Sequence, residues 1–221
     1  MLDLRLSLTG NRSPTFLFIG AHCDDIEIGC GGTVIELMRA YPDAKVRWIV
    51  LSSGAKRAQE AKSAARQLLR GMRDAQIVVK DFRGSYFPSE APAIKEYFEE
   101  LRQSTAPDVV FSHCRDELHQ DHRTVGELTW NTFRDHMILE YEIPKYDGGL
   151  GSPSVFVALP TATVRRKTQL LMKVFKTQHG KHWFTPETFQ ALMRLRGVEC
   201  NARDGYAEAF YSRKLVLGAG Q

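Results

Sequence analysis

The sequence has 221 residues, of which 43% are hydrophobic and 25% are charged, and its formal net charge at pH 7 is +4. This composition is that of a globular protein with a sizeable apolar core, and the length fits one domain. The small net charge argues against a nucleic-acid partner, which usually requires a strongly basic domain. No apolar run approaches the ~20 residues of a membrane-spanning helix.

Strands and helices alternate along the first half of the chain. Each predicted strand is an apolar run, and each predicted helix carries apolar residues at helical spacing. The predicted strands span residues 15–21, 45–52, 74–80 and 107–112, and the helices between them span residues 31–41, 57–72 and 92–103. This order predicts right-handed βαβ units and a mostly parallel sheet.

The second half of the chain continues with mixed elements. Helices are predicted over residues 124–136, 161–177 and 186–196, strands over residues 137–143 and 154–159, a turn-rich loop over residues 144–153, and a last segment over residues 207–217. Because there is no internal repeat and no clear domain boundary, we expect a single α/β domain over residues 1–221.

The cysteines and the first residues indicate a compartment. Cys23, Cys30, Cys114 and Cys200 form no Cys-x-x-Cys pair and no evident disulfide framework, as in a reducing environment. Residues 1–14 lack the apolar core of a signal peptide. We therefore expect a cytoplasmic protein with no integral membrane segment.

A polar cluster follows the first predicted strand. Residues 21–25 read Ala-His-Cys-Asp-Asp, and a glycine-rich stretch comes after them. In open α/β sheets, ligands bind at this carboxyl end of the strands. His22 and Asp25 are three residues apart, so one tight turn can direct both at a divalent ion such as zinc. Asp24 is then left over as a candidate general base for a water molecule at the metal.

A second polar cluster follows the fourth predicted strand. It contains three of the seven histidines and two aspartates: His113, Asp116, His119, Asp121 and His122. Structural zinc sites use four ligands, whereas catalytic sites use three and keep one position open. Together the two clusters supply such a set in His22, Asp25 and His122, which predicts a catalytic metal site.

Both clusters resemble the signatures of a known family. Residues 21–27, Ala-His-Cys-Asp-Asp-Ile-Glu, resemble the A-H-P-D-D signature of the PIG-L/LmbE-like zinc-dependent N-acetyl-sugar deacetylases. Residues 119–123, His-Gln-Asp-His-Arg, resemble the second signature, H-x-D-H. The resemblance covers residues 15–135 well, and residues 206–210, Tyr-Ala-Glu-Ala-Phe, are similar to the family's ending.

This resemblance implies a fold and a reaction. The fold would be a three-layer Rossmann-like α/β fold with a mostly parallel sheet. The reaction would be hydrolytic removal of an N-acetyl group from an amino sugar such as N-acetylglucosamine, or from a nucleotide-, lipid- or glycan-linked conjugate. One Zn²⁺ per chain would be the cofactor, although iron, manganese or cobalt also suit a site with two histidines and one carboxylate.

The resemblance also implies roles for the residues of the first cluster. His22 and Asp25, together with His122, would be the metal ligands, and Asp24 would be the general base. Cys23 replaces the family's usual proline. A proline would stiffen the turn between the ligands, whereas a thiol could compete as a ligand or become oxidised.

Three further roles follow from the resemblance. His119 would act as general acid and stabilise the oxyanion, and Asp121 would orient His119 and raise its pKa. Arg57 matches a position that helps to bind the sugar.

Other interpretations are open for these residues. The glycines at positions 29, 31 and 32 could form a dinucleotide-binding turn, although they do not match Gly-x-Gly-x-x-Gly. The chain could be a non-catalytic metal-containing binding or regulatory protein, or it could hydrolyse a different amide. Arg57 could be a solvated helix charge.

The basic side chains between residues 165 and 181 could form a solvated face or meet an anionic substrate. The polar and aromatic residues 179–184 could line a sugar pocket or belong to the core.

Overall fold

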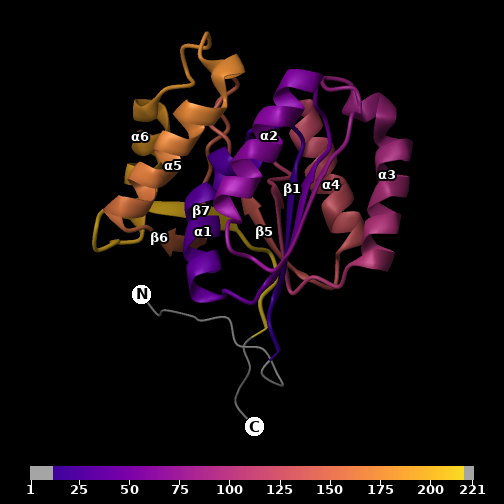
Figure 1. Cartoon of the computed structure of the whole chain (residues 1–221), viewed down its shortest axis with the longest axis horizontal. Helices are drawn as coiled ribbons and strands as arrows, with labels where there is room; N and C mark the ends of the chain where they lie inside the picture. Colours follow the sequence, from indigo (N-terminus) through magenta and orange to yellow (C-terminus); the bar gives the residue numbers. More distant parts are fainter. Residues whose placement is uncertain (1–11, 217–221) are drawn as a thin grey trace.

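The structure is a computed structural model, and it describes residues 12–216 (Figure 1). Its centre is a seven-stranded sheet in the order β3-β2-β1-β4-β5-β7-β6. The strands are β1 (Thr15–Gly20), β2 (Lys45–Val50), β3 (Asp74–Val79), β4 (Val109–His113), β5 (Met137–Tyr141), β6 (Val155–Ala158) and β7 (Ala207–Tyr211). Residues 1–11 of the first segment (residues 1–14) and residue 217 of the last segment (residues 207–217) lie outside the described residues.

Helices cover both faces of this sheet. They are α1 (Asp25–Ala40), α2 (Ala55–Leu68), α3 (Phe87–Ser104), α4 (Gln120–Thr132), α5 (Thr161–Val174), the 3-10 helix η2 (Lys176–Gln178) and α6 (Pro186–Glu199). α3 and α4 lie on one face, and α1, α2, α5 and α6 lie on the other (Figure 1). The three-layer α/β fold is therefore confirmed.

The order of the strands creates a topological switch. β1 pairs in parallel with β2 on one side and with β4 on the other, and the parallel pairing extends to β3 and β5. β7 runs antiparallel between β5 and β6. The chain thus proceeds outward from β1 to β3 and then returns to the other side of β1, which places a ligand-binding crevice between β1 and β4.

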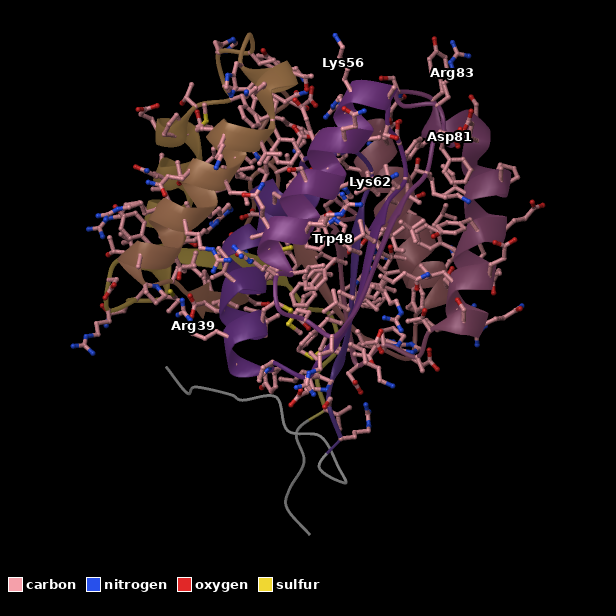
Figure 2. All side chains as sticks on the ribbon, in the orientation of Figure 1. Arg39, Trp48, Lys56, Lys62, Asp81 and Arg83 are labelled. Atoms are coloured by element: carbon pink, nitrogen blue, oxygen red, sulfur yellow. The ribbon has the colours of Figure 1, made fainter. Side chains whose placement is uncertain are left out.

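The two cores follow from alternation along the buried strands. In β1, Phe16 and Phe18 pack on the face covered by α1 and α2, whereas Leu17 and Ile19 pack under α3 and α4. Trp48 is fully buried on the first of these faces, and it lies inside the molecule in Figure 2. Charged side chains such as Lys56 and Arg83 extend outward in the same view.

Three helices begin four or more residues earlier than predicted. α1 begins at Asp25 rather than residue 31, because the glycine-rich stretch is helical and packed. α3 begins at Phe87, with a proline in its first turn, where the missing N–H is harmless. α4 begins at Gln120, which makes His119 its N-cap.

Within residues 12–216, no helix combines the length and the apolar character that crossing a membrane requires.

Candidate metal centre and active site

The two polar clusters meet at the switch point between β1 and β4. His22 follows β1, Asp25 is the first residue of α1, and His122 lies in the first turn of α4. Because β1 and β4 are paired neighbours in parallel, the loops after them leave the same edge of the sheet. The topology therefore brings together residues that are 100 positions apart.

Side-chain atoms of the three predicted metal ligands converge on one point. His22 Nδ1 lies 3.1 Å from His122 Nε2 and 3.4 Å from Asp25 Oδ2, and His122 Nε2 lies 3.5 Å from Asp25 Oδ1. Ligand atoms bound tetrahedrally at usual zinc distances lie ~3.3 Å apart, which these pairwise separations match. Within residues 12–216, the sets of donor atoms close enough to hold one ion are those of His22, His119 and His122, and those of Asp25, His113 and His122. The donor set of two imidazoles and one carboxylate also suits a divalent metal.

Two carboxylates lie behind the histidines of this group. Asp121 Oδ2 lies 3.0 Å from His22 Nε2, and Glu117 Oε2 lies 3.2 Å from His122 Nδ1. Glu117 also pairs with the ammonium group of Lys145. Such partners fix the orientation of ligating imidazoles and raise their basicity. They leave Nδ1 of His22 and Nε2 of His122 for a metal.

His113 is a further member of the cluster. Its ring is fully buried, and its Nε2 lies 3.0 Å from Asp25 Oδ2 and 3.0 Å from the backbone nitrogen of Ala21. Burial lowers the pKa of His113 to about 4, so the ring is neutral. The sequence does not show whether His113 and Glu117 are metal ligands, partners of ligands or uninvolved residues. Their position inside the second polar cluster is the only signal in the sequence for their role.

The Asp121 carboxylate pairs with the ring of His22, whereas the expected partner was His119. It accepts hydrogen bonds from the N–H groups of Ser85 at 2.5 Å and Phe87 at 3.2 Å, and its ring partner is His22. His119 Nδ1 instead accepts from the backbone N–H of Asp121 at 3.2 Å. The N-cap position of His119 folds its ring over the first turn of α4, which explains this contact. Asp121 therefore orients His22.

The protonation of His119 also differs from expectation. Burial lowers the pKa of His119, and the charge of Asp121, which acts in the other direction, does not compensate for it. Because Nδ1 is a hydrogen-bond acceptor, the proton of the neutral ring resides on Nε2.

Opposite charges within the cluster shift the pKa values of the candidate ligands. Burial would lower the pKa of His22, but Asp25 and Asp121 together raise it to about 10. Burial would raise the pKa of Asp25, but the charges of His122 and His22, together with the contact to His113, hold it well below its usual range. Protons and a metal ion would therefore compete for the same imidazole nitrogens.

Asp24 lies beside the cluster without belonging to it. Its side chain is buried, and Oδ1 accepts a hydrogen bond from Nη2 of Arg57 at 2.7 Å. Burial raises the pKa of Asp24 and outweighs the lowering effect of Arg57. The predicted sugar-binding residue Arg57 thus reaches the site and pairs with the predicted general base.

A cavity of about 540 Å³ opens onto these residues. Its mouth is formed by residues 143–147, after β5, and by Lys181 and Trp183 in the loop before α6. Tyr146 Oη lies 3.4 Å from His182 Nδ1, so the two loops touch across the mouth. Of the polar and aromatic residues 179–184, Trp183 and Lys181 therefore line the cavity.

Cys23 occupies the proline position of the first signature. Its side chain is fully buried, and Sγ donates to the carbonyl oxygen of Ser52 at 3.4 Å. Burial raises the pKa of the Cys23 thiol to about 12. Since the thiolate is the reactive species, burial makes this thiol a poor nucleophile at neutral pH.

A buried ion pair interrupts α1 behind the candidate metal ligands. The backbone of Cys30 is non-helical, with φ −143° and ψ 19°. In a continuous helix the carbonyl oxygen of Ile28 would accept from the N–H of Gly32. Here Lys167 Nζ donates to Ile28 at 2.5 Å, and Glu208 accepts from Gly32 at 2.8 Å. Lys167 and Glu208 are 2.7 Å apart, so the pair satisfies both ends of the break.

Known proteins share this fold. N,N'-diacetylchitobiose deacetylase from Pyrococcus horikoshii, complexed with the inhibitor MPG, is 20% identical, with a TM-score of 0.67 over 91% of this chain and 84% of that chain. The conserved protein TT1542 from Thermus thermophilus is 21% identical, with a TM-score of 0.70 over 93% of this chain and 97% of that chain. GalB, the 4-carboxy-2-hydroxymuconate hydratase from Pseudomonas putida, is 17% identical, with a TM-score of 0.67 over 94% of this chain and 99% of that chain.

These identities show the fold alone, and the hydratase illustrates that one fold hosts different reactions. The family assignment comes from the sequence match to PIG-L, described as GlcNAc-PI de-N-acetylase, over residues 17–133. That range is more than half of the chain, and it includes both polar clusters. The chain therefore belongs to the PIG-L family.

Proposed function

We propose that this protein is a metal-dependent N-deacetylase that acts on an N-acetylated amino sugar or on a nucleotide-, lipid- or glycan-linked conjugate of one. The observation that carries the proposal is the convergence of His22, Asp25 and His122 with Asp24 beside them in an open cavity. The description of the family as GlcNAc-PI de-N-acetylase supports the same reaction.

The residues present suit one divalent ion per chain, and zinc is the ion that their chemistry favours. His22, Asp25 and His122 would hold it. When bound, such an ion supplies a water molecule with a pKa lowered to roughly 7 and polarises the amide carbonyl.

Asp24 is the proposed proton carrier. Arg57 binds Oδ1 of Asp24, so the other carboxylate oxygen, Oδ2, is assigned the proton of the attacking water. The water oxygen adds to the amide carbon, and the C–N bond then breaks to give acetate and an amine. Because burial raises the pKa of Asp24, this carboxyl group can hold the proton and return it to the leaving nitrogen.

His119 is proposed to stabilise the negative charge that develops on the carbonyl oxygen. It lines the cavity, and its Nε2 carries the proton that can be donated to this oxygen. A general-acid role for His119 would require a second proton on the ring, which burial disfavours. Asp121 contributes indirectly by orienting His22.

A substrate panel tests the proposal. Zinc-loaded protein is expected to release acetate from at least one of the free, nucleotide-linked or lipid-linked N-acetyl amino sugars. His122→Ala is expected to lose both the activity and the metal, as measured by acetate assay and by metal analysis after dialysis. The matched control is His179→Ala, which removes an exposed histidine outside the cavity lining.

Absence of acetate release from wild-type protein with one metal per chain would contradict the proposal. A different amide substrate or a metal-containing binding protein would then account for the site.

Two substitutions at His119 separate its proposed roles. Glutamine retains an N–H donor, whereas alanine retains none, so we expect kcat of His119→Gln to exceed that of His119→Ala by about 10-fold or more. Initial rates at saturating substrate measure the difference. Equal losses in the two variants would assign proton transfer to His119 instead.

A further inference from the structure

One cationic side chain in the cavity lining, that of Lys181, forms no ion pair within residues 12–216. Arg57 and Lys145 also line the cavity, but Arg57 pairs with Asp24 and Lys145 pairs with Glu117. The ammonium group of Lys181 has no hydrogen-bond or ion-pair partner among residues 12–216. Lys181 is thus the cation that is available to a ligand.

An aromatic ring holds this ammonium group at the mouth. Lys181 Nζ lies 5.5 Å from the ring centroid of Trp183, which itself lines the cavity. A cation–π contact orients an ammonium group but leaves its charge and its N–H donors in place. The ring of Trp183 packs edge-on against buried Phe184, with centroids 5.6 Å apart.

The loop that carries Lys181 is itself held by hydrogen bonds. The N–H of Lys181 donates to the carbonyl oxygen of Gln178 at 2.9 Å, and the N–H of Phe184 donates to that of Lys181 at 3.0 Å. The loop follows α5, in the orange part of the chain in Figure 1. It is therefore a defined platform for the cation.

Lys181 lies in the lining of the same cavity as Asp24. The facing loop contributes Asp147, whose carboxylate has no partner among the described residues. An anion bound at the mouth would therefore be attracted by Lys181 and repelled by Asp147.

We infer that Lys181, positioned over Trp183, binds a phosphate group of the substrate, so that the substrate is a phosphorylated N-acyl amino sugar or a phosphodiester of one. A lysine ammonium binds phosphate as a point charge and can donate to more than one of its oxygens. This inference rests on the proposed function, and it narrows the substrate from any N-acetylated sugar conjugate to an anionic one.

Binding of two matched sugars tests this inference. The probes are N-acetylglucosamine 1-phosphate and methyl N-acetylglucosaminide, and their Kd values are measured by calorimetry on zinc-loaded protein. Wild-type protein is expected to favour the phosphorylated sugar by about 10-fold or more, as for a hydrogen bond to a charged group. Lys181→Gln lacks the ammonium group, so we expect its preference for the phosphorylated sugar, measured as the ratio of the two Kd values, to be about 10-fold smaller than in wild type.

Two controls accompany this variant. Lys176→Gln removes an exposed lysine five positions away, outside the cavity lining, and is expected to leave the ratio unchanged. Asp147→Asn removes the opposing charge and is expected to increase the preference for the phosphorylated sugar. Wild-type protein without a preference for this sugar, or Lys181→Gln with the wild-type ratio, would overturn the inference.

Failure of this inference can be distinguished from failure of the proposed function. Calorimetry requires no turnover, so a preference for phosphate that depends on Lys181 would stand even if no acetate were released. Conversely, acetate release with the same ratio of kcat/KM values for the two sugars in wild type and Lys181→Gln would retain the deacetylase and reject phosphate recognition.

Discussion

Asp24→Asn is expected to lower kcat for N-deacetylation by about 10²–10⁴-fold, while the protein keeps its metal. Asparagine cannot take the proton of the attacking water, but it retains an oxygen that can accept from Arg57 Nη2, so the local structure should persist. Acetate release at saturating substrate measures kcat, and elemental analysis of the dialysed protein measures the metal.

Asp81→Asn is the matched control for this result. Asp81 is exposed on the loop after β3 and does not line the cavity (Figure 2). Its replacement should leave kcat and metal content near the wild-type values. Near-native turnover of Asp24→Asn would refute the assignment of Asp24 as base, and loss of its metal would make Asp24 a ligand.

Lys167→Met is expected to lower the free energy of unfolding by about 3–5 kcal/mol, as for other buried ion pairs that lose one partner. Glu208 would retain its charge in an interior where 4% of its surface is exposed, and the carbonyl oxygen of Ile28 would lose the donor that now reaches it. Urea denaturation, followed by far-UV circular dichroism, measures the loss.

A second substitution and a control identify the cause of this loss. Lys173→Met, on the same helix but exposed, should change the free energy of unfolding by less than about 0.5 kcal/mol. Adding Glu208→Gln to Lys167→Met removes the stranded charge, so the double variant should be more stable than Lys167→Met alone. A double variant of equal or lower stability would show that packing, and not the unpaired charge, explains the effect.

Much of the fold could be predicted because its strands are short apolar runs with helices between them. The start of α1 could not, because glycines at positions 29, 31 and 32 are typical of a loop. In the structure, a Cβ atom at Gly29 would lie 2.2 Å from Cδ2 of Tyr141, and one at Gly32 would lie 2.6 Å from Cδ1 of Leu159. These glycines therefore permit close packing against β5 and against the residue after β6, which local sequence does not reveal.

The candidate ligands could be proposed from sequence because His22 and Asp25 are three residues apart and His122 lies in a cluster of histidines. Their metal-binding role stays a prediction, with a geometry that fits it. The partner of Asp121 could not be predicted, because the carboxylate turns toward the N–H groups of Ser85, in the loop before α3, and of Phe87, the first residue of α3, which precede it by 36 and 34 residues.

The break in α1 also has a consequence for the order in which the protein can assemble. Glu208 accepts hydrogen bonds from the N–H groups of Gly32 and Thr33, which precede it by 176 and 175 residues. During synthesis, β1 and the first signature therefore leave the ribosome long before the carboxylate that completes their helix. A chain whose synthesis stops before β7 contains every proposed metal ligand, but it lacks Glu208, the carboxylate that binds the N–H groups at the break in α1. We therefore expect metal uptake to depend on completion of the C-terminal part, which would make it a check on the integrity of the whole polypeptide.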